Sequence, residues 1–141
     1  MEFKPFDQKL VAVLNENVEL GKAMNALAHL ALGLAGSVDQ KNELRLQDYT
    51  DAGGGTHPQI SDIPFIILKG KSGKIRELRK AAIEKKIHYT DFTNTMIHET
   101  YIEQHQKMRE TKEEDLEYFG ICLFGDWKTV SELTKKFSLW R

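Results

Sequence analysis

Short apolar runs recur along the chain and predict the strands of a buried sheet. Residues 9–14, 63–69 and 118–124 are apolar segments of the length typical of buried strands. Residues 44–49 alternate between apolar and polar positions, as a half-exposed strand does. Residues 88–95 combine β-favouring side chains with alternation, which indicates an exposed or edge strand.

A first long helix is predicted over residues 19–36. Its apolar side chains recur at helical spacing, at Leu20, Met24, Leu27, Ala31 and Leu34. Further apolar residues lie off this stripe, so we expect the helix to be apolar over most of its circumference and heavily buried.

Further helices are predicted from residue 72, over 96–114 and over 129–137, whereas the three glycines within 51–58 indicate a loop. The order of elements is β-α-β-β-α-β-α-β-α. We therefore expect a single domain over residues 1–141, an α/β fold built as a three-layer α/β/α sandwich with a small mixed, mostly parallel sheet.

The net charge of the chain disfavours nucleic-acid binding as a function. The 141 residues carry a net charge of -1, whereas proteins that hold nucleic acid usually have an excess of Lys and Arg. The one locally basic segment, residues 71–86, has seven Lys and Arg residues. Such a pattern is common on a solvated helix face, and we favour that interpretation over an RNA-binding surface.

The cysteine count, the apolar runs and the first ten residues indicate where in the cell we expect the protein. Its single cysteine, Cys122, lies in an apolar run, cannot form an internal disulfide and is expected to be inert. No apolar run approaches the roughly 20 residues that span a membrane, and the first ten residues do not resemble a signal peptide. We expect a cytoplasmic protein without a membrane partner.

The first candidate site lies on the first helix. Lys22, Asn25 and His29 are spaced i, i+3 and i+7, so they form one polar stripe on an otherwise apolar helix. They follow Gly21, at the helix end where free N–H groups can meet an anion. A ligand site is one interpretation. The alternative is a solvated lysine, with the amide and imidazole bonded to a neighbouring loop.

The second candidate site lies at the end of the strand predicted over residues 88–95. Asp91, Thr93, Asn94 and Thr95 stand where ligand sites gather in open α/β sheets, at the carboxyl end of a strand. A carboxylate and hydroxyls there can orient water or a substrate hydroxyl. For Thr95 alone we favour the other interpretation, an N-cap of the following helix.

Two weaker patterns do not predict a site. His98, Glu99, Glu103 and His105 lack a spacing that brings ligands to one metal, and a solvated face explains them better. Residues 53–57 lack the Gly-Lys-Ser/Thr ending of a phosphate-binding loop, so we favour a flexible connector. We expect no metal and no cofactor.

The chain resembles the type II peptidyl-tRNA hydrolases over most of its length. A strand, an acidic-polar turn and then Leu20-Gly21-Lys22, opening an Ala-rich helix with His29, is similar to their N-terminal motif. IPFIILKG, a helix, the strand bearing Asp91, DLEYFGICLFGD and a closing amphipathic helix then follow the same order.

The chain is still more similar to a bacterial domain-of-unknown-function family, family 2000, built on that fold. The pattern Gly21-Lys22…Asn25-Ala26…His29 and the ending Gly120…Gly125 carry this resemblance. It implies a domain without an established activity.

The resemblance to the hydrolases also implies site residues. In that family a lysine after the glycine, an aspartate at the strand end and a threonine four residues later serve the active site. Those roles would fall on Lys22, Asp91 and Thr95. The chain has Phe92-Thr93-Asn94-Thr95 where the hydrolases have Ala-Gly-Arg-Thr, and it adds an acidic helical segment over 96–117.

Three functions follow as hypotheses. The first is binding of a small anionic or nucleotide-like ligand in a pocket lined by Lys22, Asn25, His29 and Asp91. The second is hydrolysis of peptidyl- or aminoacyl-tRNA esters, with Lys22 stabilising negative charge and Asp91 activating water. The third is a protein-interaction module that uses the charged helix over 98–114. A homodimer is among the assemblies we expect, and tRNA is a partner that the net charge disfavours.

Overall fold

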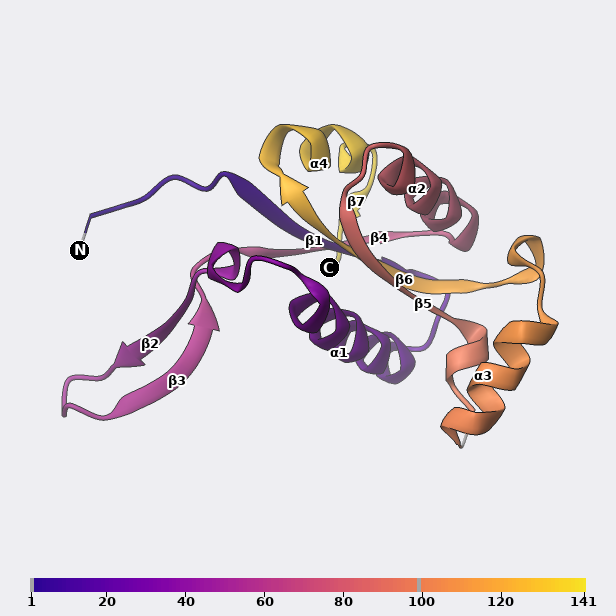
Figure 1. Cartoon of the computed structure of the whole chain (residues 1–141), viewed down its shortest axis with the longest axis horizontal. Helices are drawn as coiled ribbons and strands as arrows, with labels where there is room; N and C mark the ends of the chain where they lie inside the picture. The colour runs from indigo at the N-terminus through magenta and orange to yellow at the C-terminus, as the bar shows by residue number, and fades with distance from the viewer. Residues whose placement is uncertain (1, 99) are drawn as a thin grey trace.

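Over the residues that the structure describes, the chain forms a mixed α/β fold around a five-stranded sheet, with four α-helices and a separate hairpin (Figure 1). The computed structural model describes residues 2–98 and 100–141. The elements in chain order are β1 (Gln8–Asn15), α1 (Leu20–Ser37), a 3-10 turn (Lys41–Leu44), β2 (Leu46–Thr50), β3 (Thr56–Ser61), β4 (Phe65–Gly70), α2 (Ser72–Glu84), β5 (His88–Thr93), a 3-10 turn (Asn94–Met96), α3 (Tyr101–Glu110), a 3-10 turn (Glu113–Asp115), β6 (Tyr118–Asp126), α4 (Trp127–Thr134) and β7 (Ser138–Leu139).

The sheet is mixed, in the order β5-β6-β1-β4-β7. Among the strands that the structure describes in this sheet, only β1 and β4 are parallel neighbours, while β1–β6, β5–β6 and β4–β7 are antiparallel. The expectation of a mostly parallel sheet was therefore wrong. The reason is that β6 enters between β5 and β1 in the opposite direction, after the long segment that contains α3. The prediction of an edge strand at 88–95 is confirmed by β5.

Helices cover both faces of the sheet (Figure 1). The alternation of β1 makes this clear, because Leu10, Ala12 and Leu14 belong to the core that contains α1. Val11 and Val13 belong to the other core, which α2 and α4 complete. Cys122 of β6 lies on the α1 side, fully buried, and burial raises the pKa of its thiol to about 12. The expectation that Cys122 is buried in a strand core is confirmed.

The α1 helix is less buried than its composition suggests. Its buried positions are Ala23, Ala26, Leu30 and Leu34, which lie on one stripe at helical spacing. Leu20, Met24 and Leu32 are 60%, 61% and 74% exposed, so the expected burial around most of the helix was wrong. The two alanines bring the helix close to the sheet, whereas Leu20, Met24 and Leu32 point to solvent.

The β2–β3 hairpin stands apart from the main sheet (Figure 1). The predicted strand at 44–49 corresponds to β2, which begins two residues later. The loop predicted over 51–58 ends earlier, because Thr56, His57 and Pro58 belong to β3. Its turn places Gly54 at a φ of 86°, a conformation that glycine adopts without steric cost.

The segment after β5 is not one helix. The prediction of a helix over 96–114 is corrected to α3 at Tyr101–Glu110, between two 3-10 turns. The Thr100 hydroxyl caps α3 by accepting a hydrogen bond from the Glu103 N–H at 3.2 Å. The cap predicted at Thr95 was therefore wrong, and Glu99 lies outside the described residues. In the part of the chain that the structure describes, no helix has both the length and the apolar character to cross a bilayer.

Candidate functional site

A pocket of about 440 Å³ lies at the β5 edge of the sheet, between α1 and α3. Three elements and one turn supply its walls. The lining residues are His29, Leu30, Gly33, Thr90, Asp91, Phe92, Met96, Gln104, His105 and Met108. Two residues that the sequence singled out, His29 and Asp91, therefore meet at one pocket.

The α1 wall of this pocket is fixed by contacts with β5. The Thr90 hydroxyl donates a hydrogen bond to the Leu30 carbonyl at 2.9 Å, which ties the helix to the strand. The His29 ring stacks on Phe92, with ring centroids 5.6 Å apart and an interplanar angle of 27°. Phe92 is buried, so an exposed imidazole is held by an immobile aromatic ring.

The opposite wall comes from α3 and the turn before it. The Gln104 side-chain amide donates to the His98 carbonyl at 2.7 Å, which folds the start of α3 back on the turn. Met96 and Met108 add two thioethers, which are polarizable and adapt to the shape of a ligand. None of the ten residues of α3, all of which the structure describes, is buried. This wall is therefore the loosely packed side of the pocket.

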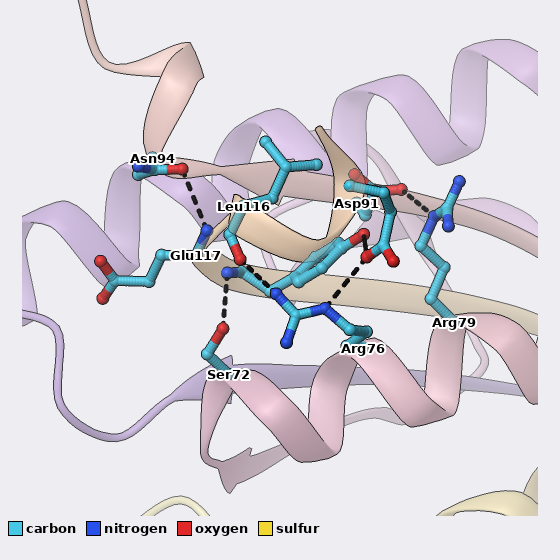
Figure 2. Close-up of polar contacts among 9 residues, drawn as sticks. Ser72, Arg76, Arg79, Asp91, Asn94, Leu116 and Glu117 are labelled. Atoms are coloured by element: carbon cyan, nitrogen blue, oxygen red, sulfur yellow. Dashed lines mark hydrogen bonds and ion pairs between the residues drawn. The ribbon is translucent and has the colours of Figure 1, made fainter. Parts of the chain in front are cut away.

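The Asp91 side chain is paired with a residue of α2 (Figure 2). Arg79 Nε donates to Asp91 Oδ2 at 3.2 Å. Because strand side chains alternate, Phe92 faces α1 and Asp91 faces the α2 side of the sheet. Burial raises the pKa of the Asp91 carboxyl above its ordinary value, although the Arg79 guanidinium acts in the opposite direction.

A second arginine of α2 organises the strand end beside this pair (Figure 2). Arg76 Nε donates to Glu113 Oε2 at 3.0 Å, and a terminal nitrogen of Arg76 donates to the Leu116 carbonyl. The buried Tyr118 hydroxyl donates to the same Glu113 oxygen at 2.8 Å. That hydrogen bond, followed by Arg76, lowers the pKa of Glu113, and burial together with Glu113 raises the pKa of Tyr118.

Sequence reasoning missed this network. Arg76 and Arg79 lie in the basic segment that was interpreted as a solvated face, yet both are partly buried and paired. Their spacing of three residues places them on one side of a helix, which is the signal that could have marked them.

The predicted lysine lies away from this pocket. Lys22 is exposed near the start of α1, next to Gly21, and neither residue lines the pocket that contains Asp91. Asn25 is exposed on the same helix and is also outside the lining. The expected meeting of Lys22 and Asp91 around one cavity is absent from the described pockets, because the carboxylate is bonded to α2 and Lys22 lies on the helix of the other face.

The remaining predicted residues are integrated into the fold. Thr93 and Thr95 are buried, and their hydroxyls bond to each other at 2.7 Å and contact the Met108 sulfur. Asn94 joins the ends of β5 and β6: its N–H donates to the Glu117 carbonyl at 2.9 Å, and its side-chain oxygen accepts from the Glu117 N–H at 3.1 Å (Figure 2). These contacts hold the strand end beneath α3.

Comparison with known proteins agrees with the architecture. A protein of unknown function from Agrobacterium tumefaciens strain C58, Atu0240, has a similar solved structure, with a TM-score of 0.84 and 20% sequence identity over 97% of this chain and 100% of that one. At this identity the likeness shows the fold alone. No curated protein matches the chain. The model of the family described as protein of unknown function DUF2000 matches residues 8–141, and the chain therefore belongs to the DUF2000 family.

Proposed function

We propose that this domain binds a small nucleotide-like ligand, a planar ring that carries an anionic group, in the pocket between α1, β5 and α3. The observation that carries the proposal is the exposed imidazole of His29, stacked on the buried Phe92 ring at a pocket of about 440 Å³. Pockets for small molecules typically have volumes of about 300–1,000 Å³. The size therefore suits a ring with a short substituent.

The planar ring is argued from His29. One face of its imidazole stacks on Phe92, and the side chain remains exposed at the pocket. A ligand ring laid on the imidazole would extend this stack, which is favourable for offset aromatic rings. The thioethers of Met96 and Met108 suit contact with the edge of such a ring.

The anionic group is argued from the polar side chains of the wall. His29 and His105 each offer a ring N–H that can donate to an anionic oxygen. The negative charge of Asp91 is countered by Arg79, so this carboxylate does not leave an unpaired charge that would repel the ligand. We assign Asp91 to positioning of the β5 edge rather than to direct contact with the anion.

Isothermal titration with adenosine monophosphate tests the proposal. Loss of one aromatic stacking partner in His29→Ala should weaken binding roughly 2- to 10-fold. His105→Ala should weaken the nucleotide more than it weakens adenosine, because it removes a donor to the anionic group. His57→Ala is the matched control, since His57 lies in the hairpin, paired with Asp51.

The proposal fails under two results. One is the absence of saturable binding for adenosine, guanosine, cytidine and uridine monophosphates. The other is a nucleotide affinity that His29→Ala and His105→Ala leave equal to that of His57→Ala.

Hydrolysis of peptidyl- or aminoacyl-tRNA esters is the second candidate. It follows from the resemblance to the type II peptidyl-tRNA hydrolases and their three-layer sandwich, and one feature of the site favours it. The raised pKa of Asp91 brings this carboxyl closer to the range in which a general base or acid operates. Turnover of an N-blocked aminoacyl-tRNA that Asp91→Asn abolishes and Lys107→Ala leaves intact would support this activity. Equal turnover in the two variants would remove the role of Asp91.

A further inference from the structure

The two parallel neighbours of the sheet send the chain to opposite faces. β1 continues into α1 on one face, and β4 continues into α2 on the other. Their carboxyl ends lie side by side, because Asn15 pairs with Gly70 and the Glu16 N–H donates to the Gly70 carbonyl at 3.0 Å. In open α/β sheets, ligands bind in the crevice that forms at such a point.

A groove of about 720 Å³ lies at this point. The carboxyl end of β4, the α2 helix, the α4 helix and the segment that leads to β7 form its walls. It shares no lining residue with the pocket of His29. It is therefore a separate candidate site, on the other face of the sheet.

The rim of the groove is cationic. Five lysines and three glutamates line it, which leaves an excess of two positive charges in a chain of net charge -1. Two of the lysines form ion pairs. Lys74 pairs with Glu77 within α2, and Lys135, just beyond the end of α4, pairs with Glu132 of that helix. Among the described residues, Lys69, Lys71 and Lys136 have no carboxylate within 4.0 Å.

The floor of the groove is apolar. Leu78 and Ala81 of α2 face Leu133 and Phe137 across it. The Phe137 ring packs against the end of β4, where a Cβ on Gly70 would lie 2.7 Å from a ring carbon. Only a glycine at this position leaves room for the ring. The aromatic floor is thus built into the end of the strand that carries Lys69.

We propose that this groove binds a small phosphate monoester whose ring or chain rests on the apolar floor. A phosphate dianion matches the two excess positive charges, and Lys71 and Lys136 are the cations free to contact it, because the alternation of β4 points the Lys69 side chain to the α1 face. Lysine suits this task because its ammonium group presents three donors on a flexible stem.

Titration with phenyl phosphate, followed by ¹H–¹⁵N NMR at constant ionic strength, tests the proposal. Saturable shifts at Gly70 and Lys71 are expected, with weaker binding of inorganic phosphate and none of phenol. Lys71→Gln/Lys136→Gln should weaken phenyl phosphate roughly tenfold or more, because it removes the two contacting charges. Lys107→Gln, an exposed lysine on α3, is the control and should bind as the wild type does.

A second variant tests the floor without changing charge. Ala81→Met places a longer side chain in the groove and should weaken phenyl phosphate while leaving inorganic phosphate unchanged. His29→Ala should change neither affinity, so this site and the proposed nucleotide pocket can fail independently.

Three results would overturn the proposal. They are no saturable binding of phenyl phosphate, equal affinity in Lys71→Gln/Lys136→Gln and Lys107→Gln, and displacement of phenyl phosphate by tRNA at much lower concentration, which would make these lysines part of an RNA surface.

Discussion

The imidazole of His29 stacks on the buried ring of Phe92, with centroids 5.6 Å apart. Phe92 also belongs to the core between α1 and the sheet, and it packs at 6.2 Å from Phe119. One core residue thus holds an exposed histidine at the wall of the pocket. The proposed ligand site and the stability of the fold are therefore connected at this position.

A substitution of Phe92 by a residue of similar volume can separate its effect on ligand binding from its effect on stability. Phe92→Leu should keep the core filled and lower the free energy of unfolding by no more than about 1.5 kcal/mol. It removes the ring on which His29 stacks, so nucleotide affinity should fall as it does in His29→Ala. Urea denaturation and calorimetric titration measure the two effects. Wild-type affinity in Phe92→Leu would show that the stack does not position the ligand.

The hydroxyl of Tyr118 supports the charge of Glu113. Tyr118→Phe removes a partly buried hydrogen bond to a carboxylate and should cost about 1.5 kcal/mol of stability near neutral pH. Because the pKa of Glu113 is lowered in the fold, its contribution to stability is present above its ordinary value and is lost as the pH falls through the lowered value. The difference between wild type and variant should therefore shrink in acid, as chemical denaturation across pH would record.

Asp91 should have the opposite pH dependence. Its pKa is raised in the fold, so the native state takes up a proton more readily than the unfolded chain, and stability is gained as the pH falls through the raised value. Asp91→Asn has no carboxyl to protonate, so it cannot gain this stability as the pH falls. Relative to the variant, the wild type should become more stable as the pH falls from neutral toward 4. A constant difference over this range would contradict the assigned environment of Asp91.

Gly120 and Gly36 differ in the space around their Cα atoms. A Cβ on Gly120 would lie 2.9 Å from Leu30, 3.0 Å from Leu14 and 3.3 Å from the Val13 carbonyl oxygen, so Gly120→Ala should cost about 1–3 kcal/mol by overpacking. A Cβ on Gly36 would meet nothing within 4 Å. Gly36→Ala is therefore the control, and thermal unfolding should show little loss for it. Equal losses in both would mean that the close approach of β6 to α1 is not what requires glycine.

The main elements follow from the sequence because their patterns are strong and local. The apolar runs at 9–14 and 118–124 correspond to β1 and β6, which are buried along most of their length. The short strands β3 and β7 were missed, since Thr56–Ser61 is almost wholly exposed and Ser138–Leu139 spans two residues. Neither carries a hydrophobic pattern that would mark it.

The site was harder to predict because it depends on long-range placement. The sequence of α1 is apolar around most of the helix, so it could not specify that Ala23 and Ala26 would face the sheet while Leu20 faces solvent. The side of the sheet that Asp91 faces depends on which face Phe92 takes, and this depends on the pairing of β5 with β6. In the structure, His29 lines a pocket as predicted, whereas Lys22 lies outside the pocket that Asp91 lines.

The proposed function depends most on the pocket of His29, and the ring signals of the histidines test it directly. In ¹H–¹³C NMR spectra, adenosine monophosphate should shift the ring signals of His29 and His105 in a saturable way. The signals of His57, in the hairpin, and of His88, bonded to Ser37 at the far end of β5, should stay unchanged. Shifts at His57 and His88 with none at His29 and His105 would contradict the proposed function.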